Sequence, residues 1–305
     1  MLAVISHAEC LQHDAGAGNP ECADRLHAIN NQLIMSGLEF VVRHYDAPLA
    51  TREQLCRAHD PAYVDRIFDI APAEGYVSLD GDTVMSPGTL NAALRASGVG
   101  IMGVDLVATG DASNAFCPVR PPGHHAERAR AMGFCLFDNI AVAAAHALAE
   151  HRYERLAIVD FDVHHDNGTE DIFRDESRVL FCSSFQHPFY PFSGDTTERE
   201  NYMPAPLPRG AGAQEFRAAI AEHWLPALEA FRPQFLFISA GFDAHASDDM
   251  SGLCLTEADY AWVTTQVMDI AQRHAGGRIV SMLEGGYDLG SLARSAVAHM
   301  KTLAD

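Results

Sequence analysis

Residues 158–165, IVDFDVHH, carry acids and histidines at alternate positions just after an apolar run. In an extended chain alternate side chains point the same way, so Asp160, Asp162 and His164 would share one side. Such groups repel or stay unpaired unless a cation lies among them. Carboxylate oxygens with an imidazole nitrogen suit zinc or a similar divalent ion. The competing interpretation, a short helix capped by Asp166 and Thr169, accounts for one acid but not for two acids and two histidines.

A second acid, Asp243, follows another apolar run in SAGFDAH at residues 239–245. Ligands of open α/β sheets bind beyond the carboxyl ends of the strands, where Asp243 would join Asp162 and His164. Three protein ligands with an open fourth position describe a catalytic zinc site. Taken alone, Asp243 is equally compatible with a turn.

Two further segments carry groups that suit hydrolysis. His124 and His125 lie in RPPGHH at residues 120–125, where they could serve as acid and base beside a metal-bound water. Tyr287 lies in EGGYD at residues 284–288, and its hydroxyl could donate to a developing oxyanion. The alternative for residues 120–125 is a pair of adjacent histidines that arose by chance. The alternative for residues 284–288 is a tight turn whose tyrosine packs against its neighbours. All four segments follow expected strands, so one edge of a sheet would gather them.

The expected strands are short apolar runs at residues 2–5, 40–45, 114–116, 156–160, 179–183, 235–239 and 278–283. Several are apolar throughout, which is typical of strands buried on both faces of a parallel sheet. Helices are expected from Ser86 to about Ala108, over 140–150, from Thr256 to His274, and from Ser291 to His299. Long loops at 117–133, 185–212 and 240–255 are expected to be functional. This alternation predicts an α/β fold around a mostly parallel sheet, in one domain spanning residues 1–305.

Composition excludes several classes of protein. The net charge of -20, from 41 acidic and 21 basic residues without a basic run, argues against a nucleic-acid partner and favours cationic ligands. The seven cysteines are odd in number and none forms a C-x-x-C pair, so neither a disulfide scaffold nor a cysteine-zinc site is expected. The first ten residues do not resemble a signal peptide, and no apolar run approaches the ~20 residues that a membrane helix needs. We therefore expect a cytoplasmic protein without a membrane partner.

Together, RPPGHH at 120–125, GFC at 133–135, DFDVHH at 160–165 with NGT at 167–169, AGFDA at 240–244 and EGGY at 284–287 resemble the histone deacetylase and acetylpolyamine amidohydrolase family. The resemblance spans nearly the whole chain in order, and it is closest to the class II side. It implies the arginase–deacetylase fold, with a central parallel sheet flanked by helices. It also implies one zinc ion on Asp162, His164 and Asp243. A structural potassium ion would lie on Asp160, Ser183 and Ser184, and a second monovalent site near residues 173, 179 and 201.

The resemblance also implies roles for the other site residues. His125 would be the base and then the acid, oriented by Asn167, and His124 its electrostatic partner, oriented by Asp160. Tyr287 would polarise the amide carbonyl together with zinc. The substrate would contact six residues along an entrance tunnel: Asp82, Gly133, Phe134, Tyr190, Met250 and Gly285.

Several residues depart from the family pattern. Asp166 stands where glycine is usual, Tyr190 where phenylalanine is common, and Phe192 where the loop has glycine. Asp249 replaces a common proline and Asn19 a common histidine. His245 stands where two-metal arginases carry a further acid, which favours a single zinc. The expected substrate is acetyl-lysine or a related small acylated amine; acetylpolyamine hydrolysis and a catalytically silent binding module are the alternatives.

Overall fold

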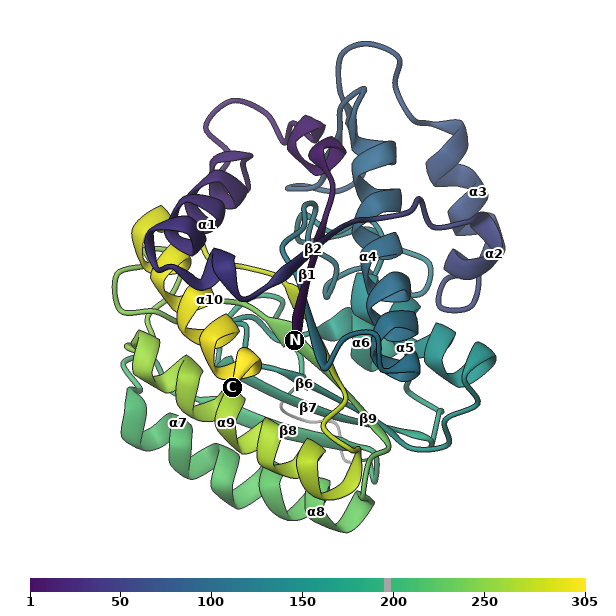
Figure 1. The fold of residues 1–305 in the computed structure, drawn as a ribbon. Coiled ribbons are helices and arrows are strands. Elements are labelled where there is room, and N and C mark those ends of the chain that lie inside the picture. The colour runs from purple at the N-terminus through teal and green to yellow at the C-terminus, as the bar shows by residue number, and fades with distance from the viewer. Residues whose placement is uncertain (195–198) are drawn as a thin grey trace.

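The computed structural model describes residues 1–194 and 199–305. Its main feature is an eight-stranded, fully parallel sheet with the order β2-β1-β5-β10-β9-β6-β7-β8 (Figure 1). The strands are β1 Leu2–Ser6, β2 Arg43–Asp46, β5 Asn114–Cys117, β6 Leu156–Asp160, β7 Val179–Gln186, β8 Tyr202–Leu207, β9 Phe235–Ala240 and β10 Ile279–Leu283. A separate antiparallel pair joins β3 Val77–Ser78 to β4 Val84–Met85.

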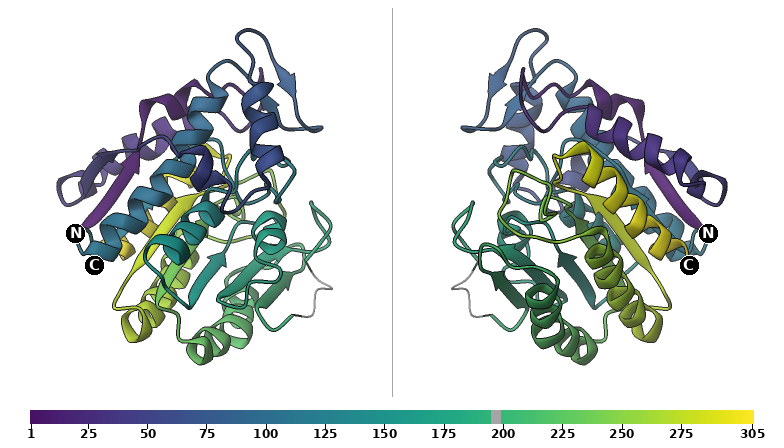
Figure 2. Two further views of the ribbon diagram at one scale, coloured as in Figure 1. Left: turned by 90° about the vertical axis from the view of Figure 1, so that its right-hand side faces the viewer. Right: turned by 90° about the vertical axis from the view of Figure 1, so that its left-hand side faces the viewer.

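Helices cover both faces of this sheet (Figure 2). They are α1 Asp24–Met35, α2 Arg52–Leu55, α3 Pro61–Asp69, α4 Thr89–Thr109, α5 Asn139–Glu150, α6 Asn167–Ile172, α7 Ala213–Ala219, α8 Leu225–Phe231, α9 Glu257–His274 and α10 Leu289–Ala304. In one layer α1 packs on α10 and α10 on α9, and in the other α4 packs on α5. The central strands β5, β6, β9 and β10 are buried along their whole length, as their apolar composition predicts.

The register of the central strands aligns the residues that matter for the site. Asp160 at the end of β6 lies beside Ser183 of β7 and Ser239 of β9. Because parallel strands all end at the same edge, the turns after β6, β9 and β10 converge there. The sheet therefore delivers three chain segments, separated by some 40 to 80 residues, to one place.

Several boundaries differ from the sequence-based expectations. Residues 38–40 form a 3-10 turn rather than the start of a strand, which begins at Arg43. Helix α4 begins at Thr89 and not at Ser86, because the backbone N–H of Ser86 bonds Thr89 Oγ1 at 2.8 Å in a turn before the helix. The last helix is capped by Asp288, whose carboxylate accepts from the N–H of Ser291, not by Ser291 itself. The predicted start of α9 at Thr256 is confirmed, and α5, expected over residues 140–150, begins at Asn139 with Asp138 as its cap.

Helix α4 corrects one further expectation. It is long and apolar enough to cross a membrane, although charged and polar residues interrupt its apolar runs. Most of that helix is buried against α5 and the sheet. Its apolar character therefore serves the core of the protein.

Candidate active site

The turns after β6 and β9 bring Asp162, His164 and Asp243 into one buried cluster. Nδ1 of His164 lies 3.0 Å from Asp162 Oδ1 and 3.3 Å from Asp243 Oδ2. Among the described residues, Asp243 Oδ2 accepts no hydrogen bond although it is shielded from solvent. Two buried carboxylates and one imidazole leave an excess of negative charge that a cation would balance. This donor set fits a divalent metal ion such as zinc.

Two glycines permit the carboxylates to come so close. A Cβ on Gly241 would lie 2.0 Å from Asp162 Oδ2, and one on Gly285 would lie 2.1 Å from Asp243 Oδ2. The N–H of Gly285 instead donates to Asp162 Oδ2 at 2.8 Å, and the N–H of Val163 donates to Asp243 Oδ1 at 2.9 Å. Backbone donors thus orient both acids, as second-sphere groups commonly orient metal ligands.

The two adjacent histidines stand beside this cluster, their ring centres 4.0 Å apart. Nδ1 of His124 lies 2.8 Å from Asp160 Oδ2, and Nδ1 of His125 lies 2.8 Å from Asn167 Oδ1. Because an amide oxygen only accepts, His125 carries its proton on Nδ1 and leaves Nε2 free as a base. Glu284 fixes the loop by accepting from the N–H of His124 at 3.1 Å.

The surroundings push the pKa values of the two histidines in opposite directions. Burial disfavours a charged His124, but the carboxylates of Asp162 and Asp160 outweigh burial and raise its pKa well above the usual value. Burial, and next the charge of His124, hold the pKa of His125 well below the usual value. At neutral pH the pair therefore offers one protonated and one neutral imidazole, which suits acid–base chemistry.

The loop that carries Tyr287 is held from two sides. The N–H groups of Tyr287 and Asp288 donate to Asp248 Oδ2 at 2.6 and 3.0 Å. Arg25 donates through Nε to the carbonyl of Gly286 at 2.7 Å, and its guanidinium carbon lies 5.0 Å from the centre of the Tyr287 ring. Sequence reasoning assigned no role to Arg25 or Asp248, because nothing local links either residue to a loop so distant along the chain.

Aromatic side chains surround the histidines as expected for a narrow entrance. The ring of Tyr190 lies 5.3 Å from that of His125, and the ring of Phe134 lies 6.1 Å from that of Tyr287. Phe189, which was not predicted, stacks on His164 at 5.2 Å. These rings form an apolar group of side chains beside the two histidines and His164.

The remaining predicted substrate residues lie on the loops of this entrance. Asp82 Oδ1 accepts from the N–H of Gly133 at 3.1 Å, which joins the Asp82 loop to the segment that carries Phe134. Gly133 has a φ of 57°, and a Cβ there would lie 2.3 Å from Cδ2 of His125. Met250 donates through its N–H to Asp248 Oδ1 at 3.0 Å, so it belongs to the loop that supports Tyr287.

Behind the site lies a second group of buried oxygens. Asp160, at the end of β6, comes together with Ser183 and Ser184 in the middle of β7, and Ser183 Oγ has no hydrogen-bond partner among the described residues. Asp166 caps α6 by accepting from Thr169 N–H at 2.8 Å. Its other oxygen is also without a partner, and burial with the nearby Asp160 raises its pKa well above the usual value. The short helix α6 and the cluster of Asp162, His164 and Asp243 are therefore both present, so one interpretation of this segment does not exclude the other.

At the predicted second monovalent site, Nδ2 of Asn201 donates to the carbonyl of Phe173 at 3.1 Å, so these two residues do meet. A third candidate cluster, Asp105 with His146 and His151, lies on α4 and the end of α5. Nη1 of Arg57 approaches Nδ1 of His146 at 3.1 Å, so that ring carries its proton on Nε2, directed at Asp105. Hydrogen bonds account for that cluster without a metal.

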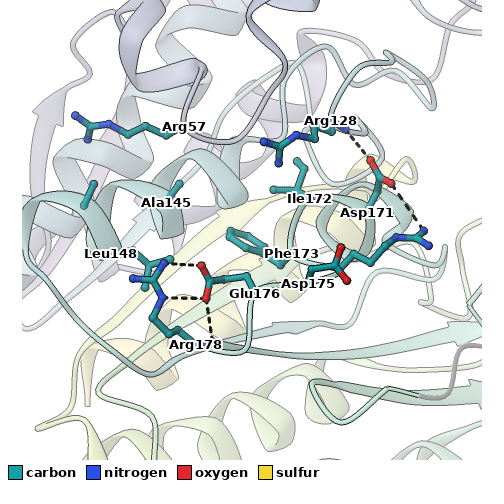
Figure 3. Close-up of a pocket in the computed structure, with 12 residues that line it drawn as sticks. Arg57, Arg128, Ala145, Leu148, Asp171, Ile172, Phe173, Asp175, Glu176 and Arg178 are labelled. Carbon is teal, nitrogen blue, oxygen red and sulfur yellow. Dashed lines mark hydrogen bonds and ion pairs between the residues drawn. The ribbon is translucent and has the colours of Figure 1, made fainter.

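A cavity of about 710 Å³ lies elsewhere (Figure 3). Arg57, Arg128 and Phe173 are among its lining residues, and none of the catalytic candidates is. Its arginines alternate with acids, as in the bond from Arg178 Nε to Glu176 at 2.9 Å. Volume alone therefore does not mark the active site of this protein.

Comparison with known proteins agrees with this geometry. The model of the histone deacetylase domain matches residues 19–303. The chain belongs to the histone deacetylase family. It is 39% identical to the histone deacetylase-like amidohydrolase of Pseudomonas aeruginosa, over 91% of this chain and 74% of that protein. It is 36% identical to the human polyamine deacetylase HDAC10, over 93% of this chain and 45% of that protein.

Among solved structures, the HDA15 HD domain superposes with a TM-score of 0.92 at 34% identity, covering 99% of this chain and 88% of the other. The arginase–deacetylase fold predicted from the sequence is thereby confirmed. Family membership makes the protein a hydrolase of the deacetylase type with a metal cofactor. The identity of the metal and the roles of individual residues remain predictions.

Proposed function

We propose that the protein is a zinc-dependent deacetylase that hydrolyses an N-acetyl or short N-acyl amide on the end of a flexible amine. The observation that carries the proposal is the buried Asp162, His164 and Asp243 cluster, with the paired histidines beside it. These three residues would hold the zinc ion, which when bound supplies Lewis-acid polarisation of the carbonyl and a more acidic water.

The chain's own residues perform the proton transfers. Nε2 of His125 accepts the proton of the attacking water, because Asn167 fixes the other nitrogen as the donor. The same atom later delivers a proton to the leaving amine nitrogen. His124, whose Nδ1 lies 2.8 Å from Asp160 Oδ2, would balance the negative charge that develops during attack. The hydroxyl of Tyr287 donates to the carbonyl oxygen as that oxygen becomes anionic.

A potassium ion on Asp160, Ser183 and Ser184 belongs to the same proposal. It is supported by the unpartnered, buried Ser183 Oγ beside the aspartate. Such an ion would offset the negative charge behind the metal ligands and tie the end of β6 to the middle of β7. The negative overall charge, the absence of a basic run and the reduced cysteines favour a cytoplasmic protein without a nucleic-acid partner.

The preferred substrate is an acetylated lysine side chain. Met250 stands seven residues after Asp243, where it offers no acid to a second substrate amine. The polyamine deacetylase among the relatives makes acetylpolyamines the second candidate, and Asp82 near the entrance would suit their cationic chain. The test compares kcat/KM of the zinc-loaded protein on acetylputrescine and on an acetyl-lysine peptide. A thousandfold preference for acetylputrescine would reverse the order.

The same substrate panel separates catalysis from binding alone. A zinc-replete protein that binds a hydroxamate but releases no acetate from any acylated amine would be a silent binding module. The free Nε2 of His125 and the presence of Tyr287 argue for turnover.

A further inference from the structure

Glu21 is a fully buried acid that has no part in the chemistry described above. Its carboxylate accepts from Arg120 at both oxygens, from Nε to Oε1 at 2.5 Å and from Nη2 to Oε2 at 2.8 Å. Oε1 also accepts from Nη1 of Arg25 at 3.3 Å, and Nε2 of His13 lies 3.3 Å from Oε2. Both guanidinium groups are shielded from solvent as well. Because a buried charge without a partner is strongly destabilising, this one acid holds the two arginines together.

Arg25 connects Glu21 to the loop that carries Tyr287. Nε of Arg25 donates to the carbonyl of Gly286 at 2.7 Å, and Nη2 donates to the carbonyl of Glu284 at 2.5 Å. Its guanidinium carbon lies 5.0 Å from the centre of the Tyr287 ring. The helices permit this approach, because α1, which carries Arg25, packs on α10, which follows the loop (Figure 1). Arg25 therefore fixes the carbonyl groups of the loop just before the tyrosine.

Arg120 connects Glu21 to the loop that carries the two histidines. It opens the RPPGHH segment, in which two prolines restrict the backbone between the arginine and the histidines. Glu284 reaches the same segment from the tyrosine loop, since its Oε2 accepts from the N–H of Gly123 at 2.7 Å. The contacts of Glu21, Arg25 and Glu284, together with the chain from 120 to 123, thus close a ring that joins both loops.

The tyrosine loop depends on this ring more than the histidines do. Both histidine rings keep hydrogen-bond partners outside the ring of contacts. The Tyr287 loop is held by Asp248 at its N–H groups and by Arg25 at its carbonyl groups. Without the carboxylate of Glu21 the two buried guanidinium groups would repel each other, and Arg25 would shift. The position of Tyr287 relative to the histidines therefore depends on Glu21.

We propose that Glu21 is a positioning residue for the oxyanion donor, because through Arg25 it fixes where the hydroxyl of Tyr287 lies relative to the histidine pair. The inference rests on the deacetylase function proposed above. A hydrogen bond to a developing oxyanion stabilises the transition state more than the bound substrate. Loss of the Glu21 charge should therefore lower kcat and leave KM nearly unchanged.

The test is a double-mutant cycle on the zinc-loaded protein with an acetyl-lysine peptide. Glu21→Gln keeps the shape of the side chain and removes its charge, so it should lower kcat about tenfold or more with KM within about twofold. In a Tyr287→Phe background the same change should lower kcat by less than about threefold, because no hydroxyl remains to be misplaced. A residue that only stabilises the fold would lower kcat by the same factor in both backgrounds.

His13→Gln is the matched control. It changes another partner of the same buried carboxylate, and the other ring nitrogen of His13 bonds Thr89 rather than either catalytic loop. Its kcat should stay within about twofold of the wild type. Zinc content and thermal unfolding show whether each variant folds. If Glu21→Gln does not fold, the same cycle is run with Glu21→Asp, which keeps the charge but is one methylene too short to reach both arginines.

Equal factors in the two backgrounds would overturn the inference. So would a Glu21 variant that is as active as the wild type, or a His13→Gln variant that loses as much kcat as Glu21→Gln. A zinc-loaded wild type that hydrolyses no acylated amine would contradict the proposed function and this inference with it. An additive cycle in an active enzyme would contradict the inference alone.

Discussion

Replacing Gly285 by alanine tests how tightly the two metal-binding acids are packed. The added Cβ would lie 2.1 Å from Asp243 Oδ2 and 2.5 Å from Asp162 Oδ2. Ordinary contact begins at 3.4 Å, so a carboxylate or the loop has to move by about 1 Å. Alanine keeps the N–H that donates to Asp162, and the backbone of Gly285 needs no positive φ. The effect is therefore steric.

Overpacking of this kind costs about 1–3 kcal/mol in a buried site. If the substitution destabilises mainly the zinc-bound protein, zinc affinity should fall about 10- to 100-fold. This is the range found when groups that support metal ligands are altered. Competition with a fluorescent zinc chelator measures the dissociation constant, and activity at saturating zinc shows what remains of catalysis. Gly81→Ala is the control, because nothing lies within 4 Å of its added Cβ. Wild-type zinc affinity and turnover in Gly285→Ala would refute the packing argument.

Three other predictions follow from the same geometry. His125→Ala should lower kcat about 10²- to 10⁴-fold with normal zinc content, because the base at Nε2 is lost. Tyr287→Phe should lower kcat about 10²- to 10³-fold while a ground-state hydroxamate still binds; full activity would contradict the oxyanion role. Burial lowers the pKa of His59 to about 4 and of His299 to about 3. In the unfolded chain both histidines have a pKa near 6.5, so the unfolded chain binds these protons at a higher pH than the folded chain does. The free energy of unfolding should therefore be retained above pH 6.5 and fall below it, by about 1.4 kcal/mol per pH unit for each histidine. Urea titrations at pH 7 and 5 measure this, and a His299→Gln variant should have the shallower slope.

The sequence predicts the central part of the fold well because β6, β9 and β10 are mostly apolar and are followed by polar turns. Strand β8 was assigned to a long loop, since Pro204 and Pro206 interrupt its pattern. Proline is tolerated there because β8 is an edge strand, with no strand paired to its outer side among residues 1–194 and 199–305. The position of a strand at the edge depends on the order of all strands in the sheet, so the sequence of that strand alone does not reveal it.

The residues of the candidate site likewise fall into those that the sequence can predict and those that it cannot. Asp162, His164 and Asp243 could be found because strand ends and residue types indicate where ligands gather. Arg25 and Asp248 could not, because their effect depends on contacts with the Tyr287 loop some 260 and 40 residues away. The unpartnered oxygen of Asp166 likewise emerges only from three-dimensional packing, since the same residue serves as an ordinary helix cap.

Anomalous diffraction at the zinc absorption edge, from crystals grown with one equivalent of zinc, tests the central claim most directly. We expect one strong peak within about 2.0–2.2 Å of ligand atoms of Asp162, His164 and Asp243. In Asp162→Ala crystals the peak should be absent or much weaker. A zinc peak at any other place, or none at this cluster in an active protein, would contradict the account.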